Sequence, residues 1–340
     1  MRDMRAFVVT GPFRSQVEDV PEPIPAAGQV VVDIERVGVC GTDVELYTGE
    51  MAYLTQGHAA YPLRPGHEWS GTVSAVGEGV DPDWVGRRTT GDTMLGCGQC
   101  RRCHGGRQNV CADRYEVGIR GGFAGALAER MAVPVSSLHP LPDNVDEAAG
   151  ALVEPGGNSL RAVRAAQLEA GDRLLILGPG TIGLLAALFA LAQGVEVHVL
   201  GLTEESLVFA RSLGVHGAWP SDRLPALAFD AVIDASFSPD LPSLALELVE
   251  PGKRVVYVGL AGSPSPIDTR ALVLKDVTAV GVLGASHGLD GTIERYAAGS
   301  VDPRPLVAAT VGLDGVGDVL AGSRPSGAGP GPKIHVDPRR

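Results

Sequence analysis

The pattern of apolar residues changes character near residue 150. Before that point, short apolar runs are interrupted by Gly and Pro, as at 6–10, 30–39 and 71–76. Such runs predict β-strands, and the frequent breaks are typical of an irregular antiparallel β domain. After that point, strand-like and helix-like segments alternate. The chain is therefore expected to contain two parts with different architectures.

The second part begins with the continuous apolar run R-L-L-I-L at 173–177, which predicts a parallel strand buried on both faces. A helix-like segment at 182–193, a strand-like one at 195–200 and a helix-like one at 204–213 follow. This alternation predicts a doubly wound parallel sheet. The further elements expected are helices at 158–168 and 292–298 and strands at 231–234, 254–259 and 333–336.

Composition narrows the class of protein. A chain of 340 residues, 44% of them hydrophobic, is long for a single core. The net charge of −12 without a basic tract argues against nucleic acid as a partner. The sequence contains no apolar run of about 18 residues, so no membrane span is expected. The N-terminus lacks the apolar core of a secretion signal. A cytoplasmic enzyme is expected, in which zinc accounts for the cysteines better than disulfides do.

Four of the five cysteines form one tight cluster. Their spacing, C-x2-C-x2-C-x7-C, can close a tetrahedral zinc shell that excludes water. An iron–sulfur site or a set of unligated thiols are the alternatives, and the polar, loop-like surroundings disfavour buried free thiols. The expected structural metal ligands are Cys97, Cys100, Cys103 and Cys111.

The isolated Cys40 lies in V-C-G-T-D, and His67 and Glu68 lie in R-P-G-H-E further along. A thiolate, an imidazole and a carboxylate leave one zinc coordination position open for chemistry. Either Glu68 or Glu154 can supply the carboxylate. Taken alone, Cys40 reads as a core cysteine and His67 as a surface histidine in a turn; their joint occurrence favours a shared catalytic zinc.

Asp43 follows Cys40 by three residues. It can accept the second N–H of the His67 imidazole and so fix the tautomer of the ring. The alternative is a helix N-cap in front of V-E-L-Y, and the two roles are compatible.

The motif G-P-G-T-I-G follows the strand at 173–177 and opens a helix, which is the context required of a dinucleotide-binding loop. A tight turn, close approach to the pyrophosphate and close helix packing each call for glycine. Free amide groups at the helix start would hold the phosphates. A glycine-rich turn without a ligand is the alternative. The residues concerned are Gly178, Gly180, Thr181, Ile182 and Gly183.

The acid that usually binds the ribose 2′-hydroxyl is missing, because Gly201 stands after the second strand of the predicted sheet. A glycine removes repulsion against a 2′-phosphate, yet no Arg or Lys follows at once; Thr203 is the nearest polar candidate. Glu204 and Glu205 can simply be the acidic first turn of a helix. NAD and NADP are nearly balanced, with a slight preference for NADP.

With these motifs in place, the chain resembles the zinc-containing medium-chain dehydrogenase/reductase (alcohol dehydrogenase) family almost end to end. The resemblance rests on V-C-G-T-D, P-G-H-E-W-S-G-T-V-S-A-V-G, the cysteine lobe, L-V-E-P, G-P-G-T-I-G and G-P-K-I. It implies a GroES-like catalytic domain at 1–152 and 291–340, with a zinc lobe near 96–112. It also implies a Rossmann domain at 153–290 and an active site in the cleft between the two.

Within the family, L-V-E-P resembles the sorbitol, threonine and glucose dehydrogenase branch, which has a glutamate at the position of Glu154. Glu45, where threonine dehydrogenases have histidine, and P-G-G-N-S-L after Glu154 weaken a threonine assignment. Polyols, sugars and cyclitols, including aminocyclitols, remain as substrate candidates, and family habit suggests a homodimer or homotetramer.

The resemblance implies reversible oxidation of a secondary alcohol to a ketone with NAD or NADP, aided by zinc. Thr42 would relay the alcohol proton. The nicotinamide would meet the backbone near Gly259 and Val282–Gly284, which follow late strands. Further pocket candidates, each at least equally compatible with packing or with a surface position, are Tyr47, His58, Trp69 and Asn158. A metal-independent quinone reductase or a non-catalytic nucleotide-binding member of the fold is the alternative, which the intact Cys40, His67 and Glu68 disfavour.

Overall fold

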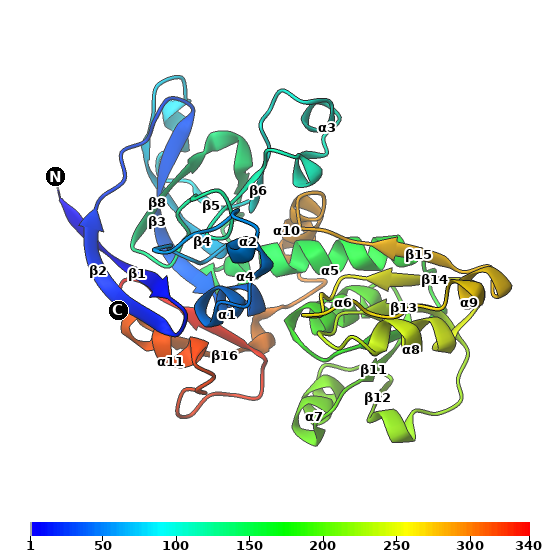
Figure 1. The fold of residues 1–340 in the computed structure, drawn as a ribbon. Coiled ribbons are helices and arrows are strands. Elements are labelled where there is room, and N and C mark those ends of the chain that lie inside the picture. The colour runs from blue at the N-terminus through cyan, green and yellow to red at the C-terminus, as the bar shows by residue number, and fades with distance from the viewer. Residues whose placement is uncertain (1) are drawn as a thin grey trace. The chain divides into compact units, whose positions relative to one another are not determined.

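The computed structural model describes residues 2–340, which form two compact units (Figure 1). The first contains the chain up to Glu154 together with Val307–Gly329 and Lys333–Arg340. The second contains Pro155–Leu306 and Pro330–Pro332. Helix α10 (Leu289–Ala297) therefore lies in the second unit, although the resemblance assigns residues from 291 onward to the first.

The first unit is built on a seven-stranded sheet with the order β16-β17-β3-β4-β5-β9, in which β8 also pairs with β3. Apart from the parallel pair β16–β17, its strands pair antiparallel, as the broken apolar runs predict. Ile34, Trp69, Leu127 and Met131 are fully buried in its core. The strands are β3 (Gln29–Gly38), β4 (Glu68–Val76), β5 (Arg88–Gly91), β8 (Arg130–Pro134), β9 (Leu138–Pro140), β16 (Val307–Val311) and β17 (Lys333–Val336).

Two smaller sheets and several short helices complete this unit. One sheet pairs β1 (Asp3–Gly11) with β2 (Arg14–Pro21), and the other pairs β6 (Met94–Leu95) with β7 (Tyr115–Glu116). The helices are α1 (Gly41–Thr48), α2 (Ala52–Thr55), α3 (Arg101–His104), α4 (Glu147–Ala151) and α11 (Val316–Leu320). Single 3₁₀ turns occur at Pro82–Trp84, Gln108–Val110, Val135–Ser137 and Leu313–Gly315.

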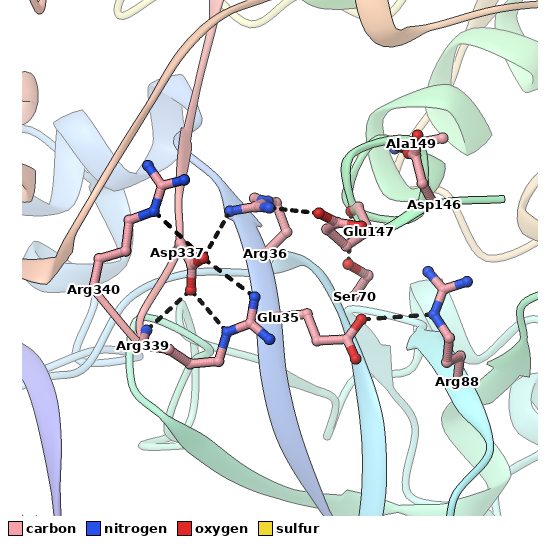
Figure 2. Close-up of polar contacts among 10 residues, drawn as sticks. All are labelled: Glu35, Arg36, Ser70, Arg88, Asp146, Glu147, Ala149, Asp337, Arg339 and Arg340. Atoms are coloured by element: carbon pink, nitrogen blue, oxygen red, sulfur yellow. Dashed lines mark hydrogen bonds and ion pairs between the residues drawn. The ribbon is translucent and has the colours of Figure 1, made fainter.

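The end of the chain is tied to the middle of this sheet. After β17 pairs with β3, the carboxylate of Asp337 lies 3.2 Å from Nη1 of Arg36. The same guanidinium donates a hydrogen bond of 2.7 Å to Glu147 on α4. Figure 2 shows these contacts, with Arg339 and Arg340 also directed at Asp337. Because Arg36 is only 8% exposed, this link between three elements is largely removed from water.

His335, in the middle of β17, is fully buried, and neither of its ring nitrogens has a hydrogen-bond partner among the described residues. Burial, assisted by the neighbouring cations Lys333 and Arg36, lowers the pKa of His335 to about 3. The ring is therefore neutral at ordinary pH. Unpartnered buried nitrogens are costly, and a buried water is the usual way in which proteins satisfy them.

The second unit contains a six-stranded parallel sheet with the order β12-β11-β10-β13-β14-β15. The strand order reverses between β10 and β13, which is where doubly wound sheets bind their ligands. The strands are β10 (Arg173–Leu177), β11 (Glu196–Leu200), β12 (Gly217–Trp219), β13 (Phe229–Asp234), β14 (Val249–Tyr257) and β15 (Thr278–Gly281). Helices α6 (Thr181–Leu191), α7 (Glu204–Ser212), α8 (Leu241–Leu248) and α9 (Thr269–Leu274), with 3₁₀ turns at Ser221–Arg223 and Arg304–Leu306, complete the unit with α5 and α10.

Helix α5 (Val153–Ala166) starts five residues earlier than the expected 158, so that Gly156 and Gly157 lie inside it. A pair of glycines normally weakens a helix. Here a Cβ at Gly157 would lie 2.9 Å from the Cβ of Ala285, and one at Gly156 would meet the hydroxyl of Tyr296. Close packing of α5 therefore accounts for the glycines. With 14 residues, α5 is too short to cross a bilayer, and no other helix within residues 2–340 has the length and apolarity to do so.

Candidate metal centre and dinucleotide-binding loop

Cys40 is the N-cap of α1, and Asp43 lies in the first turn of that helix. The Asp43 carboxylate is fully buried and accepts hydrogen bonds from the backbone N–H of Cys40 (2.9 Å) and of Gly66 (3.1 Å). Asp43 is therefore not itself the N-cap, which was one of its two expected roles. It fixes the segment that carries Cys40 against the segment that carries His67.

The imidazole of His67 faces the same carboxylate, with Nδ1 3.5 Å from Oδ1 of Asp43. This distance is too long for a good hydrogen bond, and Nδ1 has no other partner among residues 2–340. Burial alone lowers the pKa of His67, but Asp43 and then Cys40 outweigh it, so that the pKa lies well above the ordinary value. The site has a surplus of negative charge that a proton or a metal cation can neutralise.

The structure brings Cys40, His67 and Glu68 together, with one ligand atom from each residue within 4.8 Å of the others. A thiolate, an imidazole and a carboxylate form a donor set that suits zinc. Glu154, the other expected carboxylate, is buried at the start of α5, and within residues 2–340 it does not belong to this group of atoms. Of the two candidates, Glu68 is thus the one placed beside Cys40 and His67.

Lys333 is a site residue that the sequence motifs did not identify, although it lies in the quoted G-P-K-I. Its Nζ donates hydrogen bonds to Oε2 of Glu68 (2.5 Å) and to the carbonyl of Val39 (2.9 Å). Lys333 and Glu68 are 3% and 1% exposed. Burial lowers the pKa of Lys333, but Glu68 and then Cys40 raise it by more. The pKa therefore lies above its ordinary value, and the amine remains charged. The invariable cost of burying two charges is offset here by direct pairing.

The four clustered cysteines also converge. The Sγ atoms lie 3.6 Å apart for Cys100 and Cys103, 3.8 Å for Cys100 and Cys111, and 3.9 Å for Cys97 and Cys103. Four thiolates at 2.3 Å from a tetrahedral zinc ion are separated by about 3.8 Å, so the geometry fits this metal. The thiols are free. Desolvation, opposed by the backbone of Gly98 and reinforced by the neighbouring thiols, raises the pKa of Cys103 to about 11, and a cation removes this obstacle to deprotonation.

The glycine-rich loop lies at the carboxyl end of β10, next to the reversal of strand order. Gly178 has φ +101°, which an L-residue with a side chain rarely adopts. Gly180 is the N-cap of α6, and a Cβ placed on it would meet no atom within 4 Å. Gly183 packs against the carbonyl of Gly178. The open space at Gly180, in front of the free amides of Thr181 and Ile182, fits a dinucleotide pyrophosphate.

Gly201, at the end of β11, is glycine for a reason that the sequence does not reveal. A Cβ there would lie 2.8 Å from Cγ of Pro179 in the glycine-rich loop and 3.0 Å from Cδ2 of Leu207. Packing therefore excludes a side chain whichever cofactor binds, which weakens the preference for NADP. Thr203 is the N-cap of α7 and accepts a hydrogen bond from the N–H of Ser206.

The late loops lie at the same edge of the sheet. The N–H of Gly259 binds the carbonyl of Asp234, and the N–H of Val282 binds that of Tyr257. Arg161 donates to the carbonyls of Leu283 and Gly284 and so anchors the second loop to α5. These backbone contacts place both loops at the carboxyl ends of β13 to β15, where ligands of such sheets bind.

Three of the further pocket candidates pack against other side chains. Trp69 and Tyr47 belong to the main hydrophobic core of the first unit, and Tyr47 also stacks edge-on against Phe13. His58 packs edge-on against Tyr53. For these residues, the packing alternative describes what the structure shows.

Comparison with known proteins identifies the family. Residues 26–143 match the Alcohol dehydrogenase GroES-like domain, and residues 181–298 match the Zinc-binding dehydrogenase family. A 2-dehydro-3-deoxy-L-galactonate 5-dehydrogenase from Pseudoalteromonas atlantica is 33% identical over 87% of this chain and 88% of its own length. An L-threonine 3-dehydrogenase from Saccharopolyspora erythraea is 33% identical over 83% and 84%.

Among solved structures, a zinc-binding dehydrogenase from Sinorhizobium meliloti bound to NADP is 26% identical, with a TM-score of 0.90 over 99% of this chain and 100% of that one. The chain therefore belongs to the zinc-containing medium-chain dehydrogenase/reductase family, and it is an oxidoreductase with a GroES-like and a Rossmann-type domain.

For the zinc-free protein, we expect Lys333→Met to lower the free energy of unfolding by about 3–5 kcal/mol, because it leaves the Glu68 carboxylate buried without a partner. Adding Glu68→Gln should restore part of the loss. The control is Lys253→Met, whose pair with Asp230 is 42% and 28% exposed and should cost less than about 1 kcal/mol. Urea denaturation of the four proteins measures the differences, and equal costs for both lysines would contradict the prediction.

Zinc stoichiometry separates the two candidate metal sites. We expect the wild-type protein to carry two zinc ions per chain, Cys40→Ser and Cys103→Ser one each, and the double variant none, since each thiolate belongs to a different group of ligands. Elemental analysis of the purified proteins measures this. Loss of both ions from either single variant, with circular dichroism unchanged, would show that the sites are not independent.

Proposed function

We propose that this protein interconverts a secondary alcohol and its ketone by hydride transfer to or from NAD(P), on a polyol, a sugar or a cyclitol. The observation that carries the proposal is the convergence of Cys40, His67 and Glu68 in one chain with a glycine-rich dinucleotide loop. This pairing of an open metal site with a hydride acceptor matches alcohol oxidation, in which a proton and a hydride leave the same carbinol.

Cys40, His67 and Glu68 would hold the catalytic zinc, and Glu154 is the alternative carboxylate ligand. The structural zinc would be held by Cys97, Cys100, Cys103 and Cys111. A bound zinc ion supplies Lewis acidity, which stabilises the negative charge on the alcohol oxygen. Asp43 orients His67 from behind, and Lys333 restrains Glu68. These contacts keep the ligand atoms in place while the substrate exchanges with water.

Thr42 would move the alcohol proton. It lies in the first turn of α1, between Cys40 and Asp43, is partly exposed, and its hydroxyl has no hydrogen-bond partner among the described residues. A free hydroxyl beside the metal ligands can accept the proton of the alcohol and pass its own proton on to water. The carbinol hydrogen would then pass with both electrons of its C–H bond, as hydride, to the nicotinamide, while the C–O bond becomes the C=O bond of the ketone.

The dinucleotide would bind through Gly178, Gly180, Thr181, Ile182 and Gly183, with Gly201 and Thr203 near its ribose and Gly259, Val282 and Gly284 near its nicotinamide. The amides at the start of α6 suit the pyrophosphate. NADP keeps a slight preference, because no acid follows β11 directly.

The substrate class follows from the relatives and from one departure. Relatives include a dehydrogenase of a deoxy sugar acid and one of L-threonine. In both substrates, the alcohol that is oxidised is a secondary one. Glu45, where threonine dehydrogenases have histidine, disfavours threonine. We also expect a homodimer or homotetramer in the cytoplasm. The metal-independent quinone reductase and the non-catalytic nucleotide-binding member are not favoured, because neither needs the three converging ligands.

The proposed activity is tested by a spectrophotometric screen of polyols, sugars and aminocyclitols with both nicotinamides, with and without added zinc. We expect zinc-dependent NAD(P)H formation with at least one secondary alcohol. Cys40→Ser should lower kcat at least about 100-fold, whereas Cys103→Ser, at the other metal site, serves as the control. Full turnover of Cys40→Ser would overturn the catalytic zinc.

Cofactor choice is tested with two substitutions at one position. Gly201→Ala adds only the Cβ and should weaken both dinucleotides, because it displaces Pro179. Gly201→Asp adds the same Cβ together with a charge that repels a 2′-phosphate. Relative to the alanine variant, it should shift the ratio of kcat/KM values from NADP toward NAD by at least roughly tenfold. An identical ratio in both variants would mean that position 201 is not the selector.

A further inference from the structure

Arg64 is a partly buried cation that no acid among residues 2–340 neutralises. It lies in the segment between α2 and β4, its Nε is buried, and no described residue accepts a hydrogen bond from its guanidinium. Burial lowers the pKa of Arg64 to about 10, and no carboxylate opposes that shift. The side chain is still charged at neutral pH. Other buried cations of the first unit differ, because Arg36 contacts Asp337 and Lys333 contacts Glu68.

Arg64 lines a pocket of about 180 Å³. This volume has room for a phosphate or for a short carboxylate. The pocket lies between the segment 59–64 and the loop 118–124, and its walls include Leu63, Ile119 and Phe123.

The loop adds donors to this pocket. Gly122, Phe123 and Ala124 line it, and the backbone N–H of each has no acceptor among residues 2–340. Their neighbours in the loop are engaged, since the N–H of Gly121 binds the carbonyl of His58 and that of Gly125 binds the carbonyl of Arg64. Among residues 2–340, the residues that line this pocket therefore include a guanidinium without an ion-pair partner and three consecutive amides without acceptors.

A second, more open pocket of about 450 Å³ adjoins the first through Pro62, Leu63, Arg64 and Ala124. It reaches Val8 and Thr10 on β1 and Val20 on β2. Its one acid, Glu18, accepts a hydrogen bond from Gln16 (2.6 Å) and forms no ion pair with Arg64. The body of a ligand with an anionic end on Arg64 can occupy this space.

We propose that Arg64, with the amides of the 118–124 loop, forms a binding site for an oxyanion, either a carboxylate or a phosphate. A guanidinium offers paired N–H donors that match two oxygens of either group. An unpaired cation is costly to bury, and an anion that binds there offsets the cost. The site is distinct from the metal ligands and from the dinucleotide loop.

The anion can be free in solution or can belong to the alcohol substrate. Arg64 precedes His67 by three residues, so the two Cα atoms lie within about 11 Å of each other. A short acidic sugar derivative is long enough to reach from one to the other. The binding site itself does not depend on the proposed function, and the two sources of the anion give different results in the experiment below.

The first measurement is the melting temperature of the zinc-loaded protein with saturating dinucleotide, in potassium phosphate or potassium chloride of equal ionic strength. Saturation fills the phosphate site of the nucleotide loop. We expect phosphate to raise the melting temperature of the wild type by about 3 °C and that of Arg64→Met not at all. Arg120→Met is the control. Arg120 lies in the same loop, but its guanidinium stacks on Tyr53 of α2 and it does not line the pocket.

Arg64→Met should fold, because it removes an unpaired charge and keeps most of the side-chain volume. Arg64→Lys is the second variant: it retains the charge but not the paired donors, and should show a reduced shift. The proposal is overturned if the wild type melts at the same temperature in both salts, or if Arg64→Met keeps the full phosphate shift. D-Gluconate in place of phosphate tests the carboxylate in the same way.

The second measurement identifies the source of the anion. If the anion belongs to the substrate, Arg64→Met should raise KM for acidic sugars at least about tenfold while leaving KM for neutral polyols unchanged. If the anion is free, Arg64→Met changes both values of KM together or not at all, while only the wild type shows the phosphate-dependent melting shift. An inactive protein that still shows the shift would overturn the proposed function and leave the anion site standing.

Discussion

The ion pair between Lys333 and Glu68 is the constraint on which the candidate metal centre depends. Both side chains are almost fully buried, so neither charge can be left alone without a large cost in free energy. The pair joins β17 to β4 beside Cys40 and His67. Because Lys333 also binds the carbonyl of Val39, it holds the backbone that leads into Cys40. One amine thus sets the position of a carboxylate and of the residue before a thiolate.

A second carboxylate supports the same site through the other two candidate ligands. Asp43 connects the backbone of Cys40 to that of Gly66 and faces the ring of His67. Together, Asp43 and Lys333 give all three candidate ligands a buried polar partner: Asp43 serves Cys40 and His67, and Lys333 serves Glu68. The surplus of negative charge around His67 makes this corner of the first unit a place for a cation, which agrees with the zinc that the family uses.

Much of this arrangement could be predicted from the sequence, because it depends on local pattern. The strand Arg173–Leu177 and the strand Lys333–Val336 occur where the apolar runs predict them, since period and flanking glycines are local signals. The two groups of candidate metal ligands could also be predicted, because their residue types and spacings are typical of zinc sites. In the structure, the four cysteines lie together, and so do Cys40, His67 and Glu68. The glycine-rich loop follows its strand as the motif requires.

What the sequence did not reveal depends on contacts between distant residues. Lys333 lies far along the chain from Glu68, and its motif G-P-K-I does not indicate that the amine pairs with that carboxylate. Gly156 and Gly157 suggest a break, yet α5 continues through them because Ala285 and Tyr296 occupy the space of a side chain. Gly201 suggested a cofactor preference, whereas Pro179 and Leu207 already exclude a side chain there. The unpaired Arg64 shows itself only when its surroundings are known.

The late position of β17 has a consequence for biosynthesis. Lys333 follows Glu68 by 265 residues, which a ribosome adding about 5–20 residues per second needs roughly 13–50 s to make. During that interval the nascent chain already holds a thiol, an imidazole and a carboxylate, but not the amine that neutralises the carboxylate. Any cation captured early meets a more negative site than the finished enzyme has. Translation of Lys333 is therefore the event that sets the final charge of the centre.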